Sequence, residues 1–586
     1  MRRAALLVLT TAALIPSPLR AQPETLDGPW ATHDGDLSAT ASSAEIPYLF
    51  GDRPPREVWR LDLRSLGIDR AASRNPITFD SEGNLYWKTS LAGEPAGMPR
   101  VASASPAGQL RWSGRHDGEA HTLGDVIDGT AVVVGGAAVY AVGGTGGFVG
   151  GTMYVAAYDR ADGELLWQTE LPETIVGAVP GTLADLLTPI LHDGKIYVIG
   201  PDAEATLFVG LPLPRRVHRI DAASGALDWS AYIEEVESPM QGAATFVAGA
   251  FGPGEHGIYF NGDSGGDDDV PDVFAIRVDE GGATLGWAAH GGPVARSRLL
   301  YSAATELLYA PTSSERGAEL YVYDPATGFV TTGSNPDAAG HGFFDVAALD
   351  FDGTTLYAGS EEALVVAYDV AEGEPDEGRV VVAPEDGAWW GAYRVYGQLL
   401  RSPDDHLVLV TGTNSRSDLD AAYDARIVAI DLTGERILWE YRTGIIQDNG
   451  FTVRGGPLIG PDGKLYYFDT VDGALVALEA SSLPQGVGPF LRGDCNQDGQ
   501  ALGAPTDGIY LLNFLFSSGP GPKCLAACDF DGNGEVFATP TDALFFFNFN
   551  FLGGPPLPEP RGACDFSSRE EDVALGCDEP IGCADG

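Results

Sequence analysis

The chain carries a repeated pattern of alternating apolar and polar residues that predicts β-strands. In each copy an alternating run ends in Asp, a turn that contains Gly follows, and a second short run ends in Trp, as in Ala425–Trp439. Period-two alternation on both sides of such a turn is typical of a β-hairpin. The same distance from Asp to Trp recurs at Asp159–Trp167, Asp221–Trp229 and Asp279–Trp287. The pattern therefore predicts a series of hairpins of one kind.

A second motif, a turn followed by an apolar strand that contains Tyr, lies upstream of the hairpins. Together the two motifs supply four short antiparallel strands, and radial repetition of such a unit is typical of a β-propeller. Copies of the second motif occur at Gly83–Trp87, Gly194–Val198, Gly257–Phe260, Glu306–Tyr309, Gly353–Tyr357 and Gly463–Tyr467.

The spacing of the units predicts eight blades over residues 64–478. Residues 54–63, which include Trp59, are expected to add the outer strand that the last unit lacks, because joining both ends hides the sheet edges. Seven blades is the alternative, since the units at 288–331 and 332–382 lack the closing Trp. The predicted fold class is all-β: an eight-bladed β-propeller of four-stranded antiparallel blades, plus a small α-helical C-terminal module with two EF-hand-like calcium loops.

The chain is expected to begin with a secretory signal peptide. Two Arg residues precede the apolar run Ala4–Ile15, and Leu19–Ala21 is a suitable cleavage site. No later apolar stretch is long enough to cross a bilayer, and no Cys that could carry an N-terminal lipid precedes Cys495. The sequence therefore predicts a secreted, periplasmic or cell-surface protein. The predicted segments are 1–21 (signal peptide), 22–53 (lead-in), 54–483 (propeller), 484–492 (linker rich in Pro and Gly), 493–566 (calcium-binding repeat pair) and 567–586 (acidic tail containing Cys).

The strong excess of acidic residues restricts the kinds of partner. There are 35 Lys and Arg residues against 83 Asp and Glu, which gives a formal net charge of -48. Such a surface repels nucleic acid and anionic membranes and attracts divalent cations. We expect no nucleic-acid partner; the sequence does not indicate an oligomeric state.

The Gly-x-Leu-Tyr strand, the Asp-x-x-x-Gly turn and the closing Trp resemble the repeat of the PQQ-like (pyrroloquinoline-quinone-type) propeller family over about residues 54–480. The resemblance implies that the Trp residues pack between neighbouring blades. The family contains calcium-dependent quinoprotein dehydrogenases and cofactor-free binding propellers, including an outer-membrane assembly lipoprotein. The dehydrogenases typically hold the quinone against a Trp and often under two adjacent Cys residues, whereas residues 22–494 contain no Cys.

Past the linker, two copies of one acidic loop lie 35 residues apart. Each begins with the pattern D-x-[DN]-x-[DN]-G, which supplies three side-chain oxygens and a Gly for the sharp turn, as calcium loops require. An Asp at the start of a following apolar helix would complete each shell. The predicted ligands are Asp494, Asn496, Asp498, Gln500 and Asp507 in the first loop and Asp529, Asp531, Asn533, Glu535 and Asp542 in the second, with Gln500 and Glu535 acting through their backbone carbonyls.

This pair of loops, each followed by a helix, resembles the dockerin type I module. The resemblance implies docking to a protein or to a cell-surface or polysaccharide partner. The closing carboxylate of that family stands at loop position twelve, but Asp507 and Asp542 both stand at position fourteen. The helices that begin there are apolar almost all round and must be buried, either partly against a partner or wholly within the module.

All six Cys residues lie in the C-terminal part of the chain, from Cys495 onward. In an exported protein they predict up to three disulfides, with fifteen possible pairings. Zinc bound by Cys524 and Cys528 is the alternative.

No catalytic motif is present, so catalytic residues are not identified. The acidic stretch Asp263–Asp272 either binds calcium or is simply solvated, and Trp389 with Trp390 either stacks on a ligand or packs in the core. We expect a non-catalytic binding or scaffold propeller with calcium as its ion. The alternatives are a PQQ-dependent alcohol or sugar dehydrogenase, with PQQ as cofactor, and a carbohydrate-active propeller enzyme.

Overall fold

The computed structural model divides the chain into two compact units, Met1–Glu479 and Ala480–Gly586. The residues it describes are Leu26, 54–66, 77–90, 99–114, 131–145, 151–176, 188–202, 215–234, 240–262, 271, 273–289, 299–314, 317–335, 343–350, 353–360, 365–373, 375, 378–382, 393–401, 406–413, 426–433, 435–443, 458–469, 473–480, 487–501, 505–517, 519–536, 540–561, 564–567 and 569–577. In that part of the chain, no helix combines the length and apolar character needed to cross a bilayer.

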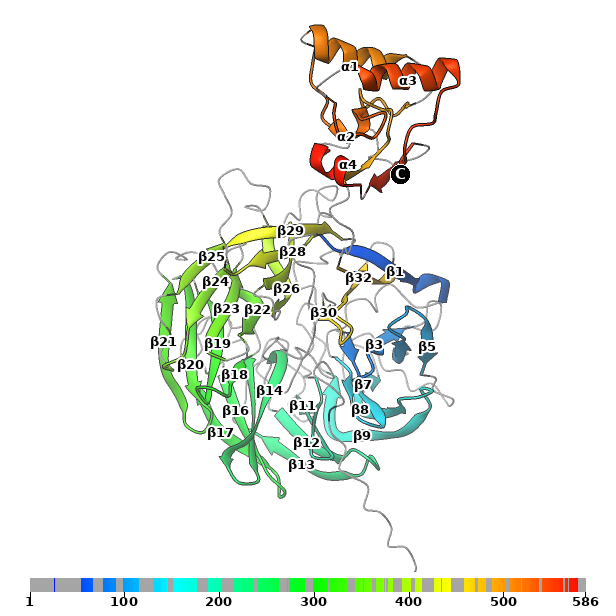
Figure 1. Ribbon diagram of the computed structural model, residues 1–586. Coiled ribbons are helices and arrows are strands. Elements are labelled where there is room, and N and C mark those ends of the chain that lie inside the picture. The colour runs from blue at the N-terminus through cyan, green and yellow to red at the C-terminus, as the bar shows by residue number, and fades with distance from the viewer. Residues whose placement is uncertain are drawn as a thin grey trace, which may run out of the picture. The chain divides into compact units, whose positions relative to one another are not determined.

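The first unit is a ring of four-stranded antiparallel sheets (Figure 1). Seven of these sheets are each built from four consecutive strands. The first four are β2 (Thr78–Phe79), β3 (Leu85–Ser90), β4 (Pro99–Ala104) and β5 (Leu110–Ser113); β6 (Val133–Val134), β7 (Ala138–Thr145), β8 (Gly151–Asp159) and β9 (Leu165–Val176); β10 (Ile190–His192), β11 (Lys195–Pro201), β12 (Arg215–Asp221) and β13 (Leu227–Ile233); and β14 (Met240–Gly252), β15 (Glu255–Gly262), β16 (Val273–Val278) and β17 (Ala283–Ala289). The next three are β18 (Leu300–Ser302), β19 (Leu307–Ser314), β20 (Gly317–Asp324) and β21 (Gly328–Asn335); β22 (Phe343–Leu349), β23 (Thr355–Ser360), β24 (Val365–Asp369) and β25 (Arg379–Val382); and β26 (Tyr393–Arg401), β27 (His406–Thr413), β28 (Arg426–Asp431) and β29 (Arg436–Arg442).

One further four-stranded sheet is composite and joins the two ends of the ring. Its strands are β1 (Arg56–Asp62), β32 (Ala474–Glu479), β31 (Leu465–Asp469) and β30 (Leu458–Ile459), in that order. β1 pairs antiparallel with β32, with Arg56 opposite Glu479 and Asp62 opposite Ala474. The Arg60 guanidinium also bonds the carboxylate of Asp469 on β31 at 2.7 Å. Seven sheets are thus contiguous in sequence, and this one is closed by a strand from before the first of them.

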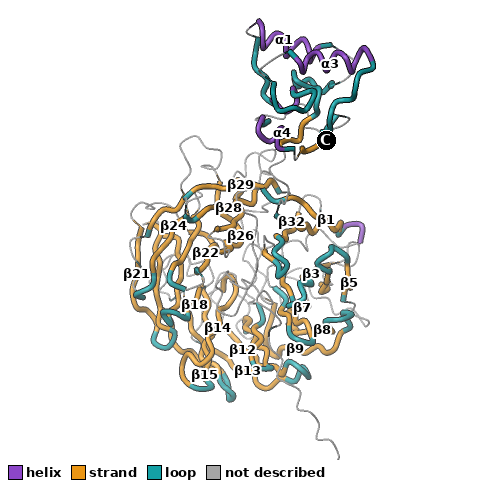
Figure 2. Tube along the Cα trace, viewed as in Figure 1, coloured by secondary structure: helices purple, strands orange, loops and turns teal. Residues whose placement is uncertain are grey.

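The predicted fold class needs correction, because the chain is mainly β and not all-β. Among the residues that the structure describes, the helices lie in the second unit, apart from the short 3-10 turn η1 (Arg64–Leu66) (Figure 2). That unit is also not purely α-helical. Its elements are β33 (Val487–Phe490), α1 (Thr506–Ser517), α2 (Leu525–Cys528), α3 (Thr541–Leu552), β34 (Asp565–Ser567) and α4 (Glu570–Leu575), with β33 paired to β34.

The Trp residues that end the hairpins pack against the next blade. The indole of Trp112 donates a hydrogen bond to the carbonyl of Arg160 at 3.0 Å. The same indole covers Gly163, where an added Cβ would lie 2.4 Å from a ring carbon. Because Gly163 also has φ +75°, both its backbone and its surroundings require glycine. Equivalent pairs are Trp59 with Gly108, Trp167 with Gly225 and Trp287 with Gly328.

In blades that carry both sequence motifs, the Tyr of one packs against the Trp of the other. Tyr86 and Trp112 have ring centroids 5.8 Å apart, and Tyr259 and Trp287 are 5.9 Å apart. Both Tyr side chains are fully buried. The expectation that the Trp residues are structural is confirmed for Trp112 and Trp287, which are almost fully buried between blades.

Replacing Gly163 by Ala is expected to destabilise the propeller unit. The substitution strains a left-handed backbone position and forces the Trp112 indole out of its place. Overpacking of this kind typically costs about 1–3 kcal/mol. Chemical denaturation should show the loss, while Gly254→Ala, which has positive φ but nothing within 4 Å of the added Cβ, reports the backbone contribution alone. Equal losses for both variants would contradict the packing role.

Candidate metal centre

The second acidic loop, Asp529–Asp542, gathers three carboxylates around one point. Asp529, Asp531 and Asp542 each place a carboxylate oxygen within 4.8 Å of the others. Asp529 and Asp542 are fully buried, and Asp531 is half-buried. Like charges at this distance repel one another unless protons or a cation offset them. The arrangement is therefore chemically suited to a cation.

Backbone N–H groups of the loop hold these carboxylates in place. Asn533 donates to Oδ1 of Asp529 and Gly534 donates to Oδ2 of Asp529, both at 3.0 Å. The same N–H of Asn533 also lies 3.1 Å from Oδ1 of Asp531. Gly534 has φ +81°, which permits the tight turn that aims these donors inward.

The first loop repeats this hydrogen bonding 35 residues earlier in the chain. Asp498 and Gly499 donate their N–H groups to the two carboxylate oxygens of Asp494 at 2.9 Å each. Asn496 stands where the second loop has Asp531, and Asp498 stands where it has Asn533, so each loop has three carboxylates and one amide in a different order. Among the described residues, three carboxylates come within 4.8 Å of one another in the second loop only.

The two Asp residues at position fourteen lie in the first turn of the following helices. Asp507 of α1 accepts the N–H of Asn496 at 3.1 Å, and Asp542 of α3 accepts the N–H of Asp531 at 3.3 Å. Oδ2 of Asp542 is buried and accepts no hydrogen bond from the described residues. A buried carboxylate oxygen without a partner is costly, and a bound cation would supply that partner.

Burial raises the pKa of the carboxyl groups in both loops. It raises the pKa of Asp542 to about 7, with Asp531 and Asp529 adding to the effect. Burial likewise raises the pKa of Asp507 to about 6, helped by Asp494 and Asp498. The pKa values of Asp494 and Asp529 are raised for the same main reason. Without a cation, burial therefore makes the carboxyls of the folded loops easier to protonate than those of an unfolded chain.

The donor set fits calcium. Calcium takes six to eight oxygen ligands, and these loops offer carboxylate, amide and backbone oxygens on a tight turn. Asn533 belongs to the second loop, where its Oδ1 accepts the N–H of Glu535 at 2.7 Å. In the first loop Asp498 and Gln500 occupy the places of Asn533 and Glu535, and Gln500 donates its N–H to Asp498 at 3.0 Å.

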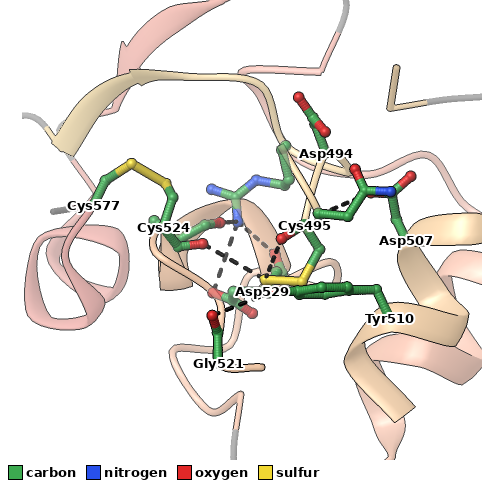
Figure 3. Close-up of a disulfide and its surroundings, with 12 residues drawn as sticks. Asp494, Cys495, Asp507, Tyr510, Gly521, Cys524, Asp529 and Cys577 are labelled. Carbon is green, nitrogen blue, oxygen red and sulfur yellow. Dashed lines mark hydrogen bonds and ion pairs between the residues drawn. A yellow bond between two sulfur atoms is a disulfide. The ribbon is translucent and has the colours of Figure 1, made fainter. Parts of the chain in front are cut away.

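Disulfides tie the loops together (Figure 3). Cys495, in the first loop, is bonded to Cys528, which immediately precedes Asp529. Cys524 is bonded to Cys577, and Cys564 is also disulfide-bonded. The disulfide prediction is confirmed, and the zinc alternative at Cys524 and Cys528 is wrong because both sulfurs are already in disulfides.

Sequence reasoning missed a buried arginine beside the second loop. Arg492 is fully buried, forms an ion pair with Asp572 at 2.5 Å, and lies 3.8 Å from a carboxylate oxygen of Asp529. It also donates to the backbone carbonyl of Ala526. Asp572 is 80 residues away along the chain, so no local pattern indicated the pair.

Two other groups of candidate residues lie outside the described part of the chain. These are the carboxylates of the stretch Asp263–Asp272 and the adjacent Trp389 and Trp390.

Solved structures resemble part of the chain at low sequence identity. No curated protein matches the chain. Among solved structures, BamB from Moraxella catarrhalis is 14% identical, with a TM-score of 0.40, and the match covers 73% of this chain and 99% of that one. The Dos1 propeller is 12% identical, with a TM-score of 0.42, over 68% of this chain and 90% of that one.

One family model also matches, and its description is outer membrane protein assembly factor BamB. It matches residues 56–265 and 154–441, which together make up more than half of the chain. The matched residues end before the second unit, so they do not identify that unit as a dockerin. The chain therefore belongs to the PQQ_2 family of BamB-like β-propellers.

Proposed function

We propose that the chain is a non-catalytic binding or scaffold propeller that acts outside the cytoplasm and attaches to a partner through its calcium-binding, dockerin-like second unit. The observation that carries the proposal is the group formed by Asp529, Asp531 and Asp542 with its buried, unpartnered oxygen. The family and the disulfides support the location, since disulfides persist in oxidising compartments.

Exposed apolar side chains on α1 and α3 support docking. Phe516 is 68% exposed and Leu552 is 79% exposed. Ile509 and Phe516 on α1 stand 35 residues before Leu544 and Phe551 on α3, and all four side chains are exposed. Residues seven apart lie on one face of a helix, and exposed apolar surface on such a face marks interaction sites in soluble proteins. Phe547 of α3 packs against Gly508 of α1, so the two helices that carry these exposed side chains are in direct contact.

Calcium would fix the surface in place. The closing carboxylates Asp507 and Asp542 belong to the first turns of α1 and α3, so an ion held by each loop also holds the start of each helix. Anionic ligands at a helix N-terminus are favoured by the helix dipole. In the absence of calcium, repulsion among the buried carboxylates would loosen the same turns.

The test is calcium-dependent attachment to the envelope of the source organism. The purified chain should sediment with isolated cell envelopes in calcium and stay in solution with chelator. Phe516→Ser with Phe551→Ser should reduce retention at least tenfold, as loss of two central apolar anchors costs several kcal/mol. The matched control Leu166→Ser with Phe329→Ser alters two exposed apolar residues of the propeller and should leave retention unchanged. Equal retention in calcium and in chelator would refute the proposal.

A further inference from the structure

The C-terminal segment Ser567–Cys577 covers the second acidic loop. The Arg569 guanidinium donates a hydrogen bond to the carbonyl of Gly532 at 2.6 Å. A Cβ on Gly532 would lie 2.9 Å from the same guanidinium, and a Cβ on Gly534 would lie 3.1 Å from the side chain of Glu571. Both glycines are inside the loop that carries Asp529 and Asp531. The segment therefore sits directly against the turn that wraps the candidate cation.

Buried contacts fasten this segment on both sides of Arg569. At its end, Cys577 is disulfide-bonded to Cys524, and the N–H of Ala526 donates to the carbonyl of Gly576 at 3.1 Å. In its middle, the buried Asp572 accepts hydrogen bonds from Arg492 and Ser567.

Arg492 connects the segment to the loop electrostatically. Arg492 and Asp572 are both fully buried, and the carboxylate of Asp572 offsets the charge of Arg492. The guanidinium of Arg492 also donates to the backbone carbonyl of Asp529. A buried arginine with a carboxylate partner holds its neighbours in one geometry, because breaking the pair leaves an uncompensated charge. Asp529 is thus held in two ways: Arg492 bonds its backbone carbonyl, and N–H groups of its own loop bond its carboxylate.

The first loop has no such cover in the described part of the unit. The hydrogen bonds to the side chains of Asp494, Asn496 and Asp498 come from residues 496–500 of the same loop. Its turn is also more open to solvent: Gln497 is half-buried and Gly499 is exposed, whereas the equivalent Gly532 is buried and Gly534 is half-buried.

We propose that Ser567–Cys577 is a latch over the second loop, so that calcium leaves this loop slowly and leaves the first loop fast. The proposal deepens the proposed function and rests on its calcium sites. Release from the second loop requires the turn at Gly532–Gly534 to open against Arg569 and Glu571. Release from the first loop does not require this segment to move, because Arg569 bonds the second loop at Gly532. Arg569 is a positioning residue, since it acts on the ligands through the backbone of Gly532.

The test is calcium release from the full chain with its disulfides intact. Calcium-loaded protein is mixed rapidly with excess fluorescent chelator, and the release is followed in time. Two phases of equal amplitude are expected. Arg569→Ala should speed the slow phase about tenfold and leave the fast phase unchanged, the change expected when one charge-assisted hydrogen bond of about 1.4 kcal/mol is lost.

The matched control is Arg561→Ala. Arg561 lies just before the latch and bonds to Leu557 and Glu559, with neither loop among these partners. It should leave both phases unchanged. Asp529→Asn should remove the slow phase and keep the fast one, which assigns the phases to the loops. Identical release rates for Arg569→Ala and wild type, or an equal increase of both phases, would overturn the latch. A wild-type chain that binds no calcium would overturn the proposed function as well.

Discussion

Deleting residues 54–63 is expected to open the propeller and make it aggregate. The deletion removes β1, which pairs with β32 from Arg56 opposite Glu479 to Asp62 opposite Ala474. Strand β32, which is apolar and buried from Ala474 to Leu478, would then present an unpaired edge, and exposed edges of this kind recruit other chains. The deletion also removes the Trp59 indole from Gly108 of the neighbouring blade. Light scattering coupled to size exclusion should show loss of the monomer, and thermal melting should show a much less stable ring.

A matched point variant keeps the strand and tests only a side chain. Val58 lies in β1 and is 38% exposed, so Val58→Ala should stay monomeric with nearly unchanged stability. A monomeric deletion variant with the melting temperature of the wild type would contradict closure through β1.

The hairpins and the four-stranded sheets could be predicted from the sequence because their signals are local. The Asp-turn-Gly-Trp hairpin is complete within a few residues, and the turn at Gly163 requires glycine whatever surrounds it. The contact of Trp112 with Gly163 follows from repetition, since a blade-end Trp has the next blade's turn as its neighbour. Closure through residues 54–63 was predicted from a missing strand in the last unit, which is also a property of the repeat.

The second unit could be predicted only in part, because its organising contacts join distant residues. The two loops were recognisable from their spacing alone. The pairing of Cys495 with Cys528 and of Cys524 with Cys577 spans 33 and 53 residues and leaves no local trace. The pairing of β33 with β34 likewise brings Val487 next to Ser567. Residues that the pattern assigned to a linker and a tail therefore belong to the folded body of this unit.

The cation site shows the same limit. The pattern placed Asp542 in the second loop, but it could not show that one of its oxygens is buried without a partner. Nor could it distinguish the two loops. That difference depends on Arg569 and Glu571, which come from a segment without a recognisable motif.

Calcium is expected to raise the melting temperature of the second unit strongly, and the double variant Asp494→Ala with Asp529→Ala should abolish the effect. Binding to the folded form alone adds about 2.7 kcal/mol per site at a hundredfold excess over Kd, so two sites would add about 5 kcal/mol. Calorimetry should be done on residues 480–586, because a shorter fragment ending at 566 would lose Cys577 and cut into β34. The unit should show a calcium-dependent transition, while the double variant should melt at one temperature with calcium or chelator.

The pH dependence provides a second readout with a definite sign. Burial raises the pKa of Asp542 to about 7 and that of Asp507 to about 6, above the ordinary value near 4 of an unfolded chain. In chelator, the folded state therefore binds protons more tightly than the unfolded state, and stability should rise as pH falls from 7.5 to 5.5. In calcium, stability should instead fall as pH falls over the same range, because protons displace the ion from the same carboxylates. Parallel pH curves in calcium and in chelator would exclude these carboxylates as ligands, and Asp542→Asn with Asp507→Asn should flatten both curves.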